Sequence, residues 1–140
     1  MKQQIEMMEE FHRAFGHPID RPELITDIKS TQDLTNALNF IKLRNKLHAE
    51  ECKELDDELW ELAITGKITP NLLKEASDLL YVLLGTLVAL GVADKFEEAF
   101  KRVHESNMSK LGDDGKPVYR EDGKVLKGPN YKAPDLGDLV

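Results

Sequence analysis

The strongest constraint on the fold is the agreement between helix-capping residues and hydrophobic periodicity over residues 30–112. The first predicted helix begins near Ser30 or Asp33, two good N-cap residues, and ends where Gly66 interrupts it. Its apolar residues recur at mostly helical spacing: Leu34, Leu38, Ile41, Leu47, Leu55, Leu59 and Leu62. This stripe indicates a long amphipathic helix in an all-α fold.

The second predicted helix has Thr69 as its N-cap and Pro70 at its first position, where the missing N–H costs nothing. It runs to about Gly91 and contains the strongest apolar run of the chain, Leu79–Ala93. Polar and glycine residues interrupt that run, and it is shorter than the roughly 20 residues that span a bilayer. We therefore expect a buried helix and no membrane partner.

Weaker signals complete the predicted architecture. A third helix is expected from Asp94, in a capping box with Glu97, to Leu111. An amphipathic helix precedes the others at about Lys2–Phe15, and His17–Lys29 is expected to be a loop. After residue 112, an Asp-Gly pair between apolar residues is typical of a hairpin.

We therefore expect an all-α, four-to-five-helix bundle that forms a single domain of 140 residues. It comprises an N-terminal helix over residues 1–16, a helical core over 30–111, and a C-terminal hairpin and tail over 112–140. The net charge of −7 argues against a nucleic-acid partner, which would require a basic surface. The single Cys52 excludes an internal disulfide, and the N-terminus lacks a signal-peptide pattern, so a cytoplasmic location is expected.

Two pairs of acidic residues interrupt the apolar stripes. Glu51 and Glu54 are three residues apart, as are Glu75 and Asp78, so each pair projects from one helix face. Burying four carboxylates without compensation would cost many kcal/mol, and a divalent cation is the simplest compensation. Oxygen ligands favour Mg²⁺, with Mn²⁺ as a possible substitute. Glu50, beside the first pair, is the candidate catalytic base.

Other interpretations of the acidic residues stay open. Charged pairs at helical spacing often lie on a solvated helix face, and 32% of the residues are charged. The chain could instead be an acidic helical module for dimerisation or binding. A di-iron carboxylate site is disfavoured because it uses Glu-x-x-His pairs, and neither acidic pair contains histidine.

A resemblance to a known family lies in two segments, His48–Leu55 and Lys74–Tyr81. Together they are similar to the double motif of the MazG-like all-α nucleotide pyrophosphohydrolases, which include dimeric dUTPases and phosphoribosyl-ATP pyrophosphohydrolases. The resemblance implies that the four paired acids hold Mg²⁺ and that Glu50 assists the attacking water. It also implies a homodimer or homotetramer that cleaves a nucleoside triphosphate to a monophosphate and pyrophosphate, as nucleotide-pool housekeeping.

Substrate recognition is less constrained. Phosphoribosyl-ATP is the alternative substrate. The enzymes that cleave it are expected to carry a histidine shortly after the second acidic motif, and this chain has none over Leu79–Val82, which counts against that substrate. Four residues are candidate phosphate ligands: Asn107, Lys110, Lys127 and Tyr131. The last two belong to a basic, aromatic tail that could close as a lid or simply be mobile. Arg44 could reach phosphates or merely solvate its helix, and His48 is left out of the site.

Overall fold

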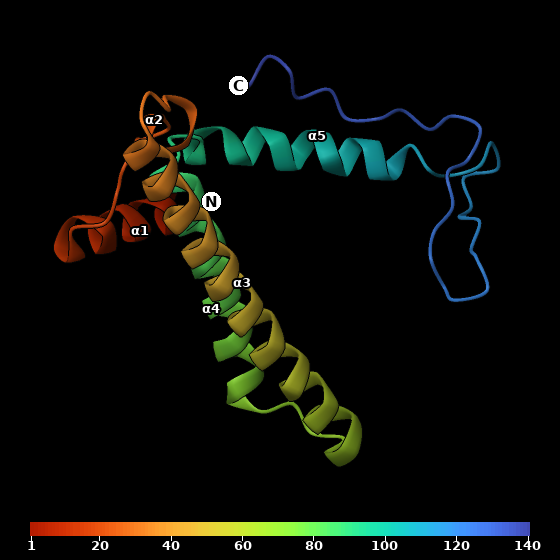
Figure 1. Ribbon diagram of the computed structural model, residues 1–140. Helices are drawn as coiled ribbons and strands as arrows, with labels where there is room; N and C mark the ends of the chain where they lie inside the picture. The colour runs from red at the N-terminus through yellow and green to blue at the C-terminus, as the bar shows by residue number, and fades with distance from the viewer. The chain divides into compact units, whose positions relative to one another are not determined.

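The computed structural model describes residues 1–140 and contains helices but no β-strand (Figure 1). The elements are α1 (Lys2–Phe15), α2 (Glu23–Thr26), α3 (Thr31–Thr65), α4 (Pro70–Ala89), the 3₁₀ turn η1 (Ala93–Lys95) and α5 (Phe96–Met108). The predicted all-α class is confirmed. The chain divides into two compact units, residues 1–93 and residues 94–140. By length and composition no single helix could cross a membrane, although α4 and the 93–108 segment pass that test as a bent pair.

Helix α3 begins and ends where its capping residues predict. The Ser30 hydroxyl accepts a hydrogen bond from the Asp33 N–H at 3.1 Å, which satisfies a donor that the first helical turn leaves free. At the other end Gly66 adopts a left-handed conformation with φ of 68°, and its N–H donates to the Leu62 carbonyl at 2.8 Å. Local chemistry therefore fixes both ends of a helix of 35 residues.

Helix α4 returns antiparallel along α3 after a short turn (Figure 1). Thr69 is its N-cap, with its hydroxyl accepting from the Leu72 N–H at 3.4 Å, and Pro70 is its first residue, as predicted. The same hydroxyl donates to the Glu58 carboxylate at 3.0 Å, which links the turn to α3. The two helices thus form a hairpin, and the bond between Thr69 and Glu58 fixes the position of the start of α4 along α3.

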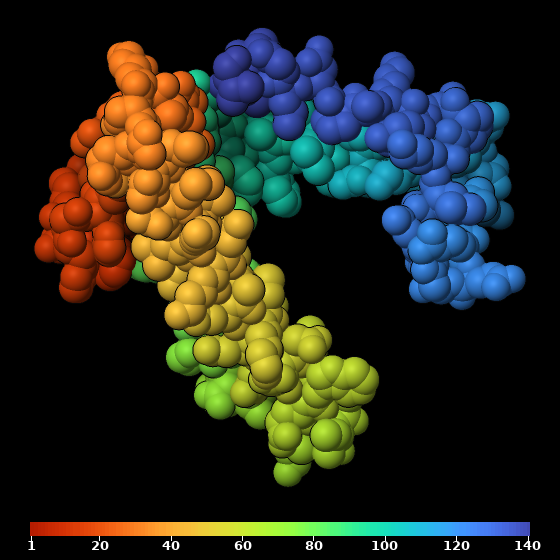
Figure 2. Space-filling view, in the orientation of Figure 1, coloured from red at the N-terminus to blue at the C-terminus, as the bar shows by residue number.

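The core of the first unit lies where α1 packs on α4 and α2 packs on α3. Its buried apolar side chains are Met8, Ala37, Leu84, Val88, Ala89 and Ala93. The far end of the α3–α4 hairpin stands clear of α1 (Figure 2). Large apolar residues stay exposed along the whole of both helices: Leu34, Leu38, Ile41, Leu43, Leu59, Trp60, Ile64, Leu73, Leu80 and Leu83.

The segment between α1 and α3 is more ordered than a plain loop. Glu23–Thr26 forms the short helix α2, where the sequence pattern predicted a loop. Just before it, the N–H groups of Asp20 and Arg21 donate to the Val88 and Ala89 carbonyls at 3.0 and 2.8 Å. These bonds satisfy carbonyls that the C-terminal end of α4 leaves free, so the segment acts as a cap for α4.

The second unit contains α5 and the tail, and here the predicted helix boundaries were wrong. Helix α5 begins at Phe96 with Lys95 as its N-cap, because the 3₁₀ turn occupies the predicted start at Asp94. It ends at Met108 and not at Leu111. The Lys110 carbonyl accepts the Gly128 N–H at 3.0 Å, so the tail takes over hydrogen bonding where the helix was expected to continue.

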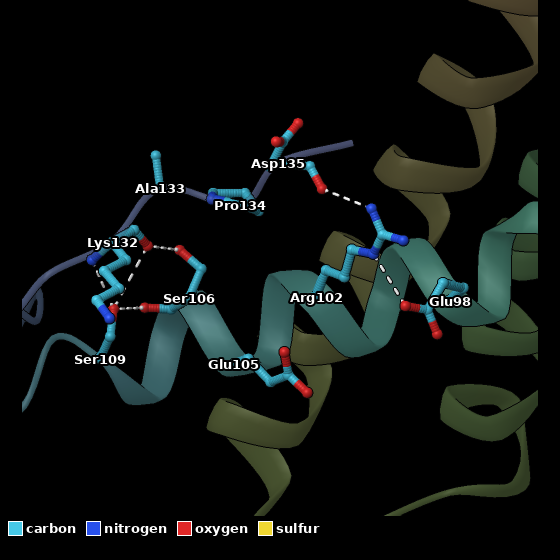
Figure 3. A pocket seen from close by; sticks show the side chains of 9 residues that line it. All are labelled: Glu98, Arg102, Glu105, Ser106, Ser109, Lys132, Ala133, Pro134 and Asp135. Carbon is cyan, nitrogen blue, oxygen red and sulfur yellow. Dashed lines mark hydrogen bonds and ion pairs between the residues drawn. The ribbon is translucent and has the colours of Figure 1, made fainter. Parts of the chain in front are cut away.

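The tail folds back and lies along α5 (Figure 3). A single antiparallel bridge joins Tyr119 and Val125 around the predicted Asp-Gly turn, without forming a named strand. The Ser106 hydroxyl donates to the Lys132 carbonyl at 2.7 Å, and Arg102 pairs with Asp138. Between α5 and the tail lies a cavity of about 380 Å³.

Candidate metal centre

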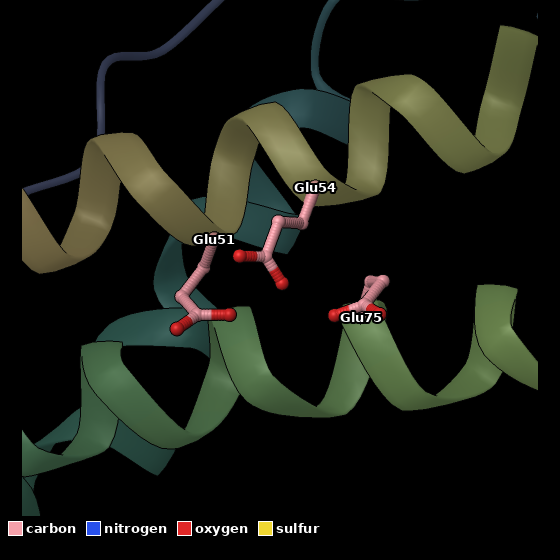
Figure 4. A group of neighbouring side chains, drawn as sticks. All are labelled: Glu51, Glu54 and Glu75. Carbon is pink, nitrogen blue, oxygen red and sulfur yellow. The ribbon is translucent and has the colours of Figure 1, made fainter.

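The α3–α4 hairpin brings acidic residues from both helices to one place (Figure 4). A carboxylate oxygen from each of Glu51, Glu54 and Glu75 lies within 4.8 Å of the others. Glu75 is only 8% exposed, whereas Glu54 is exposed and Glu51 is intermediate. Three oxygen ligands at this spacing suit a hard divalent cation, which several carboxylates and waters can share.

Asp78 lies one helical turn after Glu75 and is connected to it through a lysine. The Lys74 ammonium is 2.9 Å from a carboxylate oxygen of Asp78 and 2.9 and 3.0 Å from the two oxygens of Glu75. These contacts raise the pKa of Lys74 above its ordinary value, so the amine stays protonated. Lys74 therefore supplies one positive charge to the acidic cluster.

The cluster keeps an excess of negative charge despite Lys74. Burial raises the pKa of Glu51 above its ordinary value, and repulsion from Glu54, Asp78 and Glu75 raises it further, with Lys74 opposing. Each ionised carboxylate therefore makes the next one harder to ionise. A divalent cation between them would relieve this repulsion.

Glu50 is not brought into the group of three. Consecutive residues of an α-helix point about 100° apart. The side chain of Glu50 is accordingly 49% exposed, and it pairs with Lys46 at 3.6 Å. In this conformation Glu50 lies beside the acidic cluster, on the solvent side of α3.

The four candidate phosphate ligands gather at the C-terminal end of α5, in the second unit. The Lys110 ammonium donates to the Asn107 side-chain oxygen at 2.7 Å. The Lys127 ammonium lies 4.3 Å from the centre of the Tyr131 ring, within the range of a cation–π contact. The Gly128 N–H donates to the Lys110 carbonyl, which places the second pair beside the first. A Cβ on residue 128 would lie only 2.5 Å from that carbonyl oxygen. The close approach of the tail to α5 therefore requires glycine.

A polar network in the first unit was not found from the sequence. Arg44 donates from Nε to the Thr86 hydroxyl at 2.8 Å and from Nη2 to the Val82 carbonyl. The same hydroxyl lies 3.2 Å from Nε2 of His48. Arg44 and His48 are one helical turn apart, and Thr86 is a polar residue in the apolar run of α4. The spacing of Arg44 and His48 and the isolated Thr86 could have suggested a polar network. Only the packing of α4 against α3 shows that the three side chains are in contact.

Replacing Lys74 with methionine is expected to increase the affinity of the acidic cluster for Mg²⁺ by roughly 2- to 10-fold, since exposed ion pairs contribute little each. The ammonium occupies carboxylate oxygens that a metal would use, and its charge repels a cation. Isothermal titration of Mg²⁺ into both proteins measures the change. Lys101→Met, which removes an exposed lysine paired with Glu105, is the matched control. A weaker affinity for Mg²⁺ in Lys74→Met would contradict the idea that the Lys74 ammonium competes with the metal for the carboxylates.

Comparison with known proteins adds one match. The family model described as phosphoribosyl-ATP pyrophosphohydrolase matches residues 8–107, which include both acidic motifs. No curated protein matches the chain. The match confirms the predicted resemblance and identifies a hydrolase that acts on phosphoric anhydrides. The chain thus belongs to the phosphoribosyl-ATP pyrophosphohydrolase family, within the MazG-like all-α superfamily of nucleotide pyrophosphohydrolases.

Proposed function

We propose that this protein hydrolyses a nucleoside triphosphate to a nucleoside monophosphate and pyrophosphate, with Mg²⁺ as its cofactor. The observation that carries the proposal is the meeting of Glu51, Glu54 and Glu75 from two helices within 4.8 Å. Asp78, through its contact with Lys74, is the fourth acid of the proposed site. The family typically depends on a divalent metal, and oxygen-only ligands favour magnesium, with manganese as a substitute.

A bound Mg²⁺ would polarise a phosphoryl oxygen and neutralise charge on the substrate. The α3–α4 pairing brings together the backbones that carry the carboxylates of the acidic cluster, so a cation would need to displace only the Lys74 ammonium from Glu75 and Asp78. Glu50 is the proposed base that orients or deprotonates the water, and its exposed carboxylate must leave Lys46 to do so. Asn107, Lys110, Lys127 and Tyr131 are the proposed phosphate contacts.

The proposed assembly is a homodimer or homotetramer. Its support is the row of large apolar side chains that α3 and α4 leave exposed, including Leu59, Trp60 and Ile64 at 48, 65 and 79%. Exposed apolar patches of this kind mark interaction surfaces. The proposed setting is the cytoplasm, without nucleic-acid or membrane partners, in keeping with the acidic net charge of −7.

The experiment that tests the reaction measures pyrophosphate and phosphate release from a panel of canonical, deoxy-, uracil-containing and oxidised nucleoside triphosphates. Each is assayed with Mg²⁺, with Mn²⁺ and with EDTA. We expect metal-dependent pyrophosphate and the matching monophosphate from one class of substrate. Phosphate without pyrophosphate, or turnover unchanged by EDTA, would contradict the proposal.

Phosphoribosyl-ATP belongs in the same panel as the second candidate substrate. The name of the matching family favours it, whereas the absence of a histidine from Leu79–Val82 weighs against it. Faster turnover of phosphoribosyl-ATP than of any free nucleoside triphosphate would replace the first proposal with this one. A non-enzymatic binding module no longer accounts for the chain, because the family is enzymatic.

A further inference from the structure

A second feature of the first unit is a cavity of about 420 Å³ beside the N-terminal half of α3. It is bounded by α1, α3, α4 and the segment that follows α1. Its walls are rich in rings, from Phe11, His17, Phe40 and Tyr81. Phe11 contacts Tyr81 edge-on with ring centres 5.4 Å apart and stacks on His17 at 5.7 Å. A volume of this size and an apolar, aromatic lining are typical of small-molecule sites.

The cavity also contains a charged group whose charge is not neutralised. Arg44 lines the cavity and forms no ion pair with a carboxylate. Its Nε donates to the Thr86 hydroxyl, and one Nη2 hydrogen donates to the Val82 carbonyl. Burial lowers the pKa of Arg44, but a guanidinium remains charged in proteins. The Nη1 hydrogens have no acceptor in the chain. Since no buried side-chain nitrogen or oxygen of the protein lacks a hydrogen-bond partner, these hydrogens are accessible to solvent and free to donate to a ligand.

The position of the cavity relates it to the acidic cluster. Arg44 precedes Glu51 by seven residues on α3, which is roughly 10 Å along a helix axis. Leu47, which lines the cavity, lies one turn before Glu51. On α4, Tyr81 and Val82 line the cavity one turn after Asp78. A nucleotide whose phosphates lie at the acidic cluster would therefore carry its base toward the cavity.

We propose that this cavity holds the base of the nucleotide substrate and that Arg44 selects 6-oxopurine bases, hypoxanthine or guanine, over adenine. The guanidinium presents only donors. Hypoxanthine and guanine offer it two acceptors, O6 and N7, whereas adenine places a donating amino group beside N7. This inference rests on the proposed function for the identity of the ligand and adds the class of base.

The test uses inosine and adenosine 5′-monophosphate, which differ in the group at purine position 6 and in the proton on N1. Amide chemical shifts of the full-length protein are followed during titration with each nucleotide in EDTA, so no turnover occurs. We expect the inosine nucleotide to bind at least about 5-fold more tightly, the lower end expected for a bidentate contact to a base. The shift changes should centre on Phe11, Arg44 and Tyr81.

Two variants separate recognition from structure. Arg44→Gln should bring the ratio of the two dissociation constants close to one, whereas Lys42→Gln, a matched change at an exposed position of α3, should preserve it. If Arg44→Gln does not fold, Tyr81→Leu serves instead. It should weaken both nucleotides by a similar factor, through loss of a stacking surface, and leave the ratio unchanged.

The proposal is overturned if wild-type protein binds the two nucleotides equally, or if Arg44→Gln keeps the preference. It is also overturned if the shift changes centre on the cavity between α5 and the tail. Because the titration needs neither metal nor hydrolysis, base selectivity without any turnover would count against the proposed reaction alone. Turnover of triphosphates without base selectivity would count against the cavity alone.

Discussion

Replacing Glu75 with glutamine is expected to lower metal-dependent pyrophosphate release by about a thousandfold. Glu75 is the most buried acid of the cluster, at 8% exposure, and it faces both Glu51 and Glu54. The amide keeps the shape of the side chain but removes the charge that holds a cation. A catalytic metal contributes several kcal/mol to the transition state, and about 1.4 kcal/mol corresponds to a tenfold change in rate. The measurement is kcat/KM for the best substrate of the panel.

Two controls make the result specific. Far-ultraviolet circular dichroism should show unchanged helix content, because glutamine is a good helix former and Glu75 caps no helix end. Glu61→Gln, the same substitution at an exposed position of α3, should keep near wild-type activity. Wild-type kcat/KM in Glu75→Gln would mean that the acidic cluster is not the catalytic centre.

The sequence predicted the parts of the fold that depend on local chemistry. The capping bonds of Ser30, Gly66 and Thr69 join residues at most four positions apart, so these helix ends can be derived without knowing the tertiary structure. The end of α5 could not be derived in this way. There the Lys110 carbonyl bonds to Gly128, and the sequence gives no signal that the tail returns to that point.

The same distinction applies to the candidate site. The spacing of Glu51 and Glu54 fixes their shared helix face, and the short turn after Gly66 makes an antiparallel return expected, so their meeting with Glu75 could be predicted. The partners of Arg44 could not be predicted. They depend on side-chain conformation and on the register of α4 against α3, which periodicity leaves open by a turn. The position of Glu50 could also not be predicted from its neighbours alone, because a residue adjacent to Glu51 in sequence does not lie on the same helix face.

Saturating Mg²⁺ is expected to raise the thermal unfolding midpoint of the wild-type protein by several degrees. A ligand that binds the folded state alone at about 100 times its dissociation constant stabilises that state by about 2.7 kcal/mol. For a domain of this size, that corresponds to a shift of roughly 5 to 15 °C. The acidic cluster is the expected source, because its repulsion is greatest without a cation, as the raised pKa of Glu51 indicates.

The double variant Glu51→Gln/Glu75→Gln identifies the site in the same experiment. Without metal it should unfold at a higher temperature than the wild type, since two of the mutually repelling charges are gone. With Mg²⁺ its midpoint should hardly move, because the remaining carboxylates give too few ligands for tight binding. Differential scanning calorimetry at neutral pH, with Mg²⁺ and with EDTA, measures all four midpoints. An equal shift in the two proteins would place the metal elsewhere, and the proposed reaction would then need another centre.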